Sequence, residues 1–221
     1  MTFYQQLLQA TEQERNVLLS VPLITRGATG ELSLDTYVAF LTQAYHHVKH
    51  TTPLLMSTGG RLDERYEWLR VAIAEYIDEE IGHQEWILND IEACGFDKEQ
   101  VRHGKPSLAT ELMVSYAYDM VHRVNPIGFF GMVLVLEGTS TAVASQAATA
   151  ISKSLNLPAN CFSYLSSHGD LDVEHTKFYE EIVNKIDDAG EQQQLIHAAK
   201  AFYKLYADIF RDLDKQYSEK A

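Results

Sequence analysis

Residues 126–155 read PIGFFGMVLVLEGTSTAVASQAATAISKSL, and this stretch decides the expected fold. From Val124 to Ser152, Glu137 is the only charged side chain. A helix that is apolar on every side normally lies at the centre of a helical bundle. A carboxylate there has to be paired, protonated or bound to a metal ion, because burying an isolated charge is strongly unfavourable. The alternatives for Glu137 are a structural salt bridge, a hydrogen bond to a hydroxyl such as Thr139, or a partly exposed helix face.

Apolar residues recur at helical spacing on both sides of this stretch, and short breaker segments separate the repeats. Ser33, Ser107 and Asn125 are expected to be N-caps, Pro126 the first residue of a helix, and Gly95 the residue that ends one. No linker or repeat divides the chain, so residues 1–221 are expected to form a single all-α domain, a bundle of about seven helices. The expected helices cover residues 3–19, 34–57 with a kink at Pro53, 63–94, 107–125, 126–155, 161–187 and 189–218, with a loop through Pro22 and residues 27–30 and a helix end at residues 59–60.

The composition excludes several classes of partner. With 31 acidic and 18 basic side chains, the 221-residue chain has a formal net charge of −13, whereas nucleic acids and anionic membrane surfaces attract an excess of Lys and Arg. Two cysteines, Cys94 and Cys161, are too few for a disulfide framework, which favours a reducing compartment. The N-terminal residues do not resemble a signal peptide. We therefore expect a cytoplasmic protein with no nucleic-acid or membrane partner.

The helix expected over residues 63–94 carries a second group of candidate residues. Glu80 and His83 fall on its apolar stripe, and Glu79 flanks the stripe. A carboxylate three residues before a histidine places both side chains on one helix face. Two polar groups in a core stripe indicate that something in the core needs ligands; the alternative is a satisfied core histidine beside a partly exposed glutamate. The apolar members of the stripe are Leu69, Ile73, Tyr76, Ile87 and Ile91.

The helix expected over residues 161–187 repeats this pattern. His168, Asp172 and His175 are spaced i, i+4 and i+7, so they are expected to share one face. Bundles that bind two iron or two manganese ions use Glu-x-x-His on two helices and single glutamates on two others. Glu137 supplies one single carboxylate, and His168 is a candidate to replace the other.

The remaining histidines give weaker signals. Asp119 and His122 show the same carboxylate-x-x-His spacing near the end of a helix, where we expect it to be accidental. His46, His47 and His50 form a local cluster that could line a cavity. Because His46 and His50 share a helix face, they are candidates for outer-shell or substrate contacts. The simpler expectation is that at least two of these three histidines are solvated.

These motifs carry a resemblance to a known family. The helical layout, with Asp78-Glu-Glu-Ile-Gly-His83, Glu137 and His168-x3-Asp172-x2-His175, is similar to the heme-oxygenase-like superfamily. Within it, the chain resembles the branch of iron-containing di-metal oxidases, which includes the chlamydial protein associating with death domains and the olefin-forming fatty-acid decarboxylases. The resemblance spans most of the chain. It implies a TenA-like helical bundle that can form a homodimer. Such a bundle would bind two Fe ions (or Mn) rather than heme, activate O₂, and oxidise a small amine, amino acid or fatty acid.

The resemblance also assigns residues. Some members of the branch place a carboxylate ligand three residues before the first histidine, which is Glu80 here, and others place it seven before, which is Tyr76. The core stripe favours Glu80 over Glu79, and Tyr76 leaves a one-metal and a two-metal centre both open. The adjacent substrate pocket is expected to include Phe129, Phe130, Met132 and Tyr179. The expected catalytic and metal-binding residues are Glu80, His83, Glu137, His168, Asp172 and His175.

Two other classes of function compete with this one. The first is a metal-free enzyme or small-molecule binder of the same fold, similar to the thiaminase-like TenA proteins or the cofactorless quinone-biosynthesis oxidase. TenA-like hydrolysis would need a cysteine near Leu134 and Val135, where this chain has none. The second is a structural or partner-binding bundle whose polar core residues only fix the register of its helices.

Overall fold

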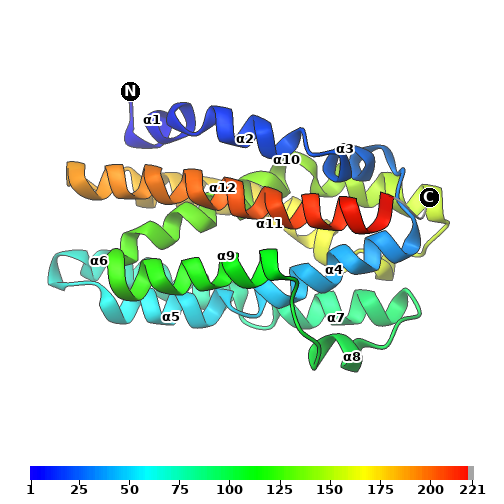
Figure 1. Cartoon of the computed structure of the whole chain (residues 1–221). Helices are drawn as coiled ribbons and strands as arrows, with labels where there is room; N and C mark the ends of the chain where they lie inside the picture. The colour runs from blue at the N-terminus through cyan, green and yellow to red at the C-terminus, as the bar shows by residue number, and fades with distance from the viewer. Residues whose placement is uncertain (219–221) are drawn as a thin grey trace.

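The computed structural model describes the backbone of residues 1–218 and the side chains of residues 1–167 and 176–217. Within that backbone the regular structure is helical, with no strand, as expected (Figure 1). Short 3-10 turns lie at Glu64–Tyr66, Pro126–Gly128 and Ala159–Cys161, and a π-helical turn lies at Met120–Val124. The α-helices are α1 (Phe3–Ala10), α2 (Glu12–Leu19), α3 (Pro22–Thr29), α4 (Leu34–Val48), α5 (Thr51–Arg61), α6 (Glu67–Glu80), α7 (His83–Ala93), α8 (Lys98–Arg102), α9 (Leu108–Asp119), α10 (Phe129–Leu155), α11 (Ser163–Val183) and α12 (Ala189–Ser218).

Helix α10 is a central helix, as its sequence predicts. It packs against α11, α12 and α3, and its first seven residues, Phe129–Val135, are all buried. Helix α12 runs between α2 and α3 on one side and α4 and α9 on the other (Figure 1). Residues Pro126–Leu155 are long and apolar enough to cross a membrane, but 61% of the apolar window is buried inside the described bundle. A buried core helix passes the same test, so this is weak evidence for a membrane span.

The capping residues behave as the sequence predicts. The Ser33 Oγ accepts a hydrogen bond from the third residue of α4 at 3.2 Å, and the Ser107 Oγ does the same for α9 at 3.3 Å. The Asn125 Oδ1 accepts from the backbone of residue 127 at 2.9 Å, so the Asn-Pro pair does begin a helical segment. Gly95 adopts φ +88°, the left-handed conformation that ends a helix and that glycine reaches without strain.

The structure divides the chain into more and shorter helices than the seven expected. The predicted helix over residues 3–19 breaks at Thr11, whose Oγ1 donates to the Leu7 carbonyl at 2.8 Å, a local bond that competes with helix continuation. The helix predicted over residues 34–57 breaks between α4 and α5 rather than kinking at Pro53, and α5 continues past residues 59–60 to Arg61. Residues 22–29, expected to include a loop, form α3 with Pro22 as its first residue.

The break that matters most for the site separates α6 from α7. We predicted one helix over residues 63–94, but Ile81 is extended (ψ 120°) and Gly82 has φ +97°, so the helix ends at Glu80 and restarts at His83. The buried stripe nevertheless continues in phase across the break, since Tyr76 is 2% exposed and Ile87 is fully buried. Hydrophobic periodicity therefore could not reveal it.

Candidate metal centre

Glu137 lies on α10 at the wall of an internal cavity, beside the phenol of Tyr76 on α6. Burial, the negative charge of Glu137 and, to a smaller extent, that of Glu80 raise the pKa of Tyr76 well above its ordinary value. Both carboxylates therefore act on the same phenol. The Thr139 hydroxyl donates instead to the Val135 carbonyl at 2.6 Å, so it does not serve Glu137 as the alternative interpretation required.

Glu80 and His83 form the second part of the site. They were expected on one helix face, and that placement is wrong, because the α6–α7 break lies between them. They still meet: the His83 Nδ1 and the Glu80 Oε2 are 3.1 Å apart, with side chains only 5% and 13% exposed. Because a carboxylate only accepts, a neutral His83 in this contact carries its proton on Nδ1, and Nε2 is then the ring nitrogen that can ligate a metal ion. The His83 ring also packs on Trp86, with centroids 4.0 Å apart.

The two neighbouring glutamates of α6 differ in direction. Glu80 is largely buried and lines the same cavity as Glu137. Glu79 is exposed and is not among the residues of the cavity wall. This placement agrees with the sequence argument that favours Glu80 over Glu79.

The other three expected ligands belong to α11. The side chains of His168, Asp172 and His175 lie outside the described residues, so their role stays a prediction. Among the side chains that the structure does describe, no three His, Cys, Asp or Glu residues form a complete metal site. The described half of the candidate centre thus consists of Glu80, His83 and Glu137.

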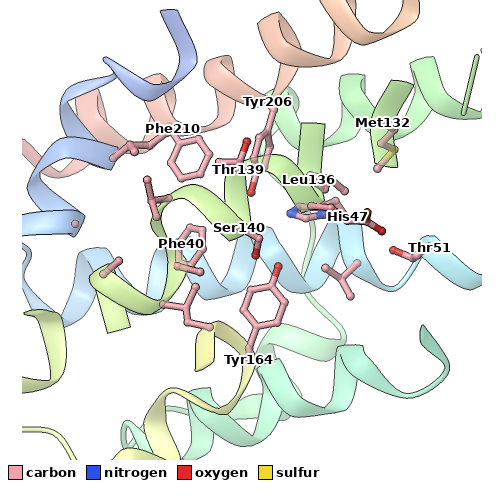
Figure 2. A pocket seen from close by; sticks show the side chains of 18 of the residues that line it. Phe40, His47, Thr51, Met132, Leu136, Thr139, Ser140, Tyr164, Tyr206 and Phe210 are labelled. Atoms are coloured by element: carbon pink, nitrogen blue, oxygen red, sulfur yellow. The ribbon is translucent and has the colours of Figure 1, made fainter. Parts of the chain in front are cut away.

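A cavity of about 140 Å³ extends from this group along one face of α10. Its volume is close to that of an engineered cavity of about 150 Å³ that binds benzene. Most of the wall is apolar and comes from α3, α4, α5, α10 and α12, whereas a few polar groups converge in the middle (Figure 2). The polar residues near the middle are His47, Thr139, Ser140, Tyr164 and Tyr206, and Thr51 lies farther to one side.

Of the four residues predicted to line the substrate pocket, two line the cavity and two do not. Phe129 and Met132 line the cavity. Phe130 and Tyr179 do not, because Phe130 is fully buried in the main core and the Tyr179 hydroxyl donates to its carbonyl at 2.8 Å. Successive residues of a helix point in different directions, so Phe129 and Phe130 could not both face one cavity.

The sequence analysis did not identify the histidines of α4 as part of the site. We expected at least two of His46, His47 and His50 to be solvated, but His46 is 1% and His47 2% exposed. His47 lines the cavity, and its ring meets the edge of Tyr206 at 5.7 Å. A usable signal existed, because His47 follows Phe40 by seven residues and both therefore face the cavity from one side of α4. His50 lies away from the cavity wall, with its Nδ1 3.0 Å from a tyrosine hydroxyl of α9.

The chain resembles known proteins in sequence and in fold. Residues 38–207 match the model of a family described as iron-containing redox enzymes. No protein of curated function matches significantly. A domain of unknown function with a heme-oxygenase-like fold from Shewanella denitrificans superposes with a TM-score of 0.87 at 22% identity, over 99% of this chain and 94% of that one.

More distant structures share the fold alone. A TenA homologue from Pseudomonas syringae gives a TM-score of 0.83 at 11% identity, over 96% of this chain and 93% of that one. Heme oxygenase-1 from the cyanobacterium Synechocystis, solved in complex with heme, gives 0.78 at 12% identity, over 100% and 96%. The expected all-α, heme-oxygenase-like and TenA-like fold is confirmed.

Proposed function

Because the chain belongs to the family of iron-containing redox enzymes, matched over residues 38–207, we propose that it is a non-heme di-iron oxidase that activates O₂. One observation carries the proposal. Glu80 and Glu137, from two helices far apart in sequence, line a single apolar cavity, and His83 contacts Glu80 at 3.1 Å. Carboxylates and an imidazole around a largely apolar cavity are the ligand types of such a centre, and register specification alone does not need them.

The donor set fits iron in the ferrous, Fe(II), state. Mixed imidazole and carboxylate ligands suit Fe(II) or Mn(II). Glu80, His83 and Glu137 would hold the ions from the α6, α7 and α10 side, and we propose His168, Asp172 and His175 of α11 as the other ligands. The bound irons would supply electrons for the activation of O₂. Heme binding is the competing assignment, because the described cavity wall includes a histidine, His47.

The chain's own residues prepare this site. The contact between Glu80 and the His83 Nδ1 orients the imidazole and presents its Nε2. The Tyr76 phenol, which burial and nearby carboxylates keep protonated, can donate a hydrogen bond to Glu137 and hold that carboxylate at the cavity wall. The apolar wall excludes water from the reacting group, which protects a reactive intermediate from side reactions.

The cavity favours one of the three substrate classes that the resemblance implies. Beyond Glu137, the α10 side of the wall consists mainly of Val143, Ala144, Ala147 and Ile151. An amine or amino acid with a polar body would lose its hydration there without gaining partners. We therefore propose a substrate with a small polar head and an apolar body, of the fatty-acid type.

Iron content tests the proposal. The purified chain is loaded anaerobically with Fe(II), desalted, and its iron measured, with about two ions expected per chain. Glu137→Gln and His175→Ala are expected to retain at least about tenfold less iron at limiting Fe(II). The matched control is His122→Ala, because His122 belongs to the accidental carboxylate-x-x-His pair and hydrogen-bonds a serine on the surface at 3.0 Å.

The outcomes separate the competing classes. A parent protein without iron, or a His175→Ala variant that holds as much as the parent, would refute the metal centre and favour a metal-free or structural bundle. Hemin titration is run in parallel, and a stoichiometric heme spectrum unaffected by Glu137→Gln would favour a heme protein. Oxygen consumption by the loaded protein with fatty acids, amino acids and amines then tests the substrate class.

A further inference from the structure

The cavity has two unequal parts on either side of a polar belt. We define the belt as His47, Ser140, Tyr164 and Tyr206, whose side chains converge in the middle of Figure 2. On one side lie Met132 and the two candidate ligands that line the cavity, Glu80 and Glu137. On the other side lies an apolar tail pocket, which we define by Phe40, Val143, Ala144, Ala147, Ile151 and Phe210.

The tail pocket extends along α10. Its α10 residues succeed one another at spacings of three and four, so they form one row on the helix. From Ser140 to Ile151 the helix rises about 16 Å. An extended polypeptide advances about 3.5 Å for every three backbone bonds, so 16 Å accommodates at most about 14 bonds of a linear chain. This length sets an upper bound for an unbranched chain, and the cavity volume of about 140 Å³ suits a shorter one.

An aromatic pair lines the tail pocket. The rings of Phe40 and Phe210 stack with centroids 5.8 Å apart and planes inclined by 23°. Tyr206 supports Phe210 edge-on at 4.9 Å. In Figure 2 the pair lies on the opposite side of the belt from Met132. Because three rings from two helices support one another, the pair forms a wall rather than a flexible flap.

The belt explains how an occupant would be oriented. Tyr164 and Ser140 point toward each other, and Tyr206 points toward His47 (Figure 2). Burial raises the pKa of Tyr206, so its phenol stays a neutral donor. These hydroxyl and imidazole groups are the polar part of a cavity whose wall is otherwise mainly apolar, so they favour the polar end of a ligand over its hydrocarbon part. A polar head fits the belt, within one helical turn of Glu137, and the apolar remainder fits the tail pocket.

We propose that the tail pocket binds a single unbranched aliphatic chain whose polar head lies at the belt, and that the Phe40–Phe210 pair sets the longest chain it accepts. The inference rests on the proposed function for the identity of the reacting centre, and it adds the orientation and the length limit of the substrate. It assigns Phe40 and Phe210 as specificity-determining residues.

The test uses metal-free protein and linear 1-alkanols of increasing length. Neutral alcohols are chosen because the Glu80 and Glu137 carboxylates repel an acid when no metal is present. Affinity is measured by displacement of an apolar fluorescent dye. Each added methylene that is buried should tighten binding about fourfold, up to a limiting length beyond which affinity levels off or falls.

Two variants should move that limit in opposite directions. In Phe210→Ala the alcohols just beyond the parent's limit should continue to gain about fourfold per methylene. In Ala147→Leu the limit should fall to shorter chains. The matched control is Phe202→Ala, which removes a fully buried ring from the same helix, α12, at a position that does not line the cavity. It should destabilise the fold without moving the limit.

Three results would overturn the inference: an affinity that does not depend on chain length, a limit that neither cavity variant moves, or an equal shift in Phe202→Ala. If Phe210→Ala does not fold, Ala147→Leu and the parent series still decide. Because the assay contains no metal, its result is independent of iron content. Iron binding without a length limit would support the proposed function and refute this inference. A length limit without iron binding would support this inference and refute the proposed function.

Discussion

Asp90 offers the sharpest stability prediction, because it joins α7, which begins at His83, to α11, which carries three of the predicted ligands. It lies on α7, the helix that begins directly after the α6–α7 break, and is completely buried. Its Oδ1 accepts from the Ser163 backbone nitrogen at 3.0 Å and from the Ser163 hydroxyl, and its Oδ2 accepts from the Tyr164 nitrogen at 2.9 Å. The carboxylate therefore caps the start of α11 from a neighbouring helix.

The magnitude follows from the groups that would be left without a partner. Asp90→Ala removes the acceptor of two backbone N–H groups, and each unsatisfied buried donor costs about 1–3 kcal/mol. The Ser163 hydroxyl can rotate to another acceptor, and the variant no longer buries a charge, so we expect a net loss of about 3 kcal/mol. For a chain of this size that corresponds to a fall in Tm of about 6–12 °C. Asp90→Asn keeps one carbonyl acceptor and should lose about half as much.

Urea unfolding followed by circular dichroism measures the loss. Asp97→Ala is the matched control, because Asp97 caps the short helix α8 with the same chemistry, its Oδ1 accepting from backbone nitrogens at 2.9 and 3.3 Å, but at the surface. An exposed cap of this kind contributes about 1 kcal/mol. If Asp90→Ala cost no more than Asp97→Ala, the buried contact would not be what fixes α11, and the reasoning would be wrong.

Three further predictions follow from single positions. A Cβ on Gly131 would lie 2.6 Å from a backbone nitrogen of α12, whereas one on Gly138 would meet nothing within 4 Å; Gly131→Ala should therefore destabilise the fold by about 1–3 kcal/mol and Gly138→Ala should stabilise it by up to about 1 kcal/mol, and equal effects in urea unfolding would contradict the close packing. Burial lowers the pKa of His46 from 6.5 to about 4. Between those values the unfolded chain binds a proton that the folded chain does not, so the free energy of unfolding should fall as pH drops from about 6.5 to about 4. His46→Gln should remove this part of the pH dependence, and a variant with an unchanged slope would assign it elsewhere. Mn(II) at 100 times its Kd should stabilise the parent by about 2.7 kcal/mol and Glu137→Gln much less; the same thermal shift in both would speak against Glu137 as a ligand.

The sequence predicted the central helix because the relevant signal is local. One charge between Val124 and Ser152 requires a buried helix whatever the rest of the chain does, and the buried residues of α10 confirm it. The same holds for the capping residues, since Ser33 and Ser107 bond to residues three positions away. Interactions within one turn of helix can be read from the sequence directly.

The break between Glu80 and His83 could not be predicted in this way. The break at Gly82 leaves the hydrophobic stripe in phase, so the periodicity of the sequence does not indicate that this glycine adopts a left-handed conformation. His47 was missed for a different reason. Three histidines within five residues point in different directions, and which direction faces the cavity depends on how α4 packs against helices far away in sequence, such as α9 and α12.

The distribution of charge connects the metal centre with the tail pocket. The excess of 31 acidic over 18 basic side chains gives the chain its net charge of −13. Two of these acidic residues, Glu80 and Glu137, face a cavity with an otherwise mainly apolar wall. Without a metal ion, these carboxylates oppose ionisation of the neighbouring phenol and would equally repel the head of an acid. With two Fe(II) ions and the three carboxylates proposed as ligands, the formal charge of the centre becomes about +1, and the sign of that interaction reverses. In the proposed enzyme, Glu80 and Glu137 would therefore oppose a fatty acid in the metal-free cavity, and as metal ligands they would belong to a centre that attracts its anionic head.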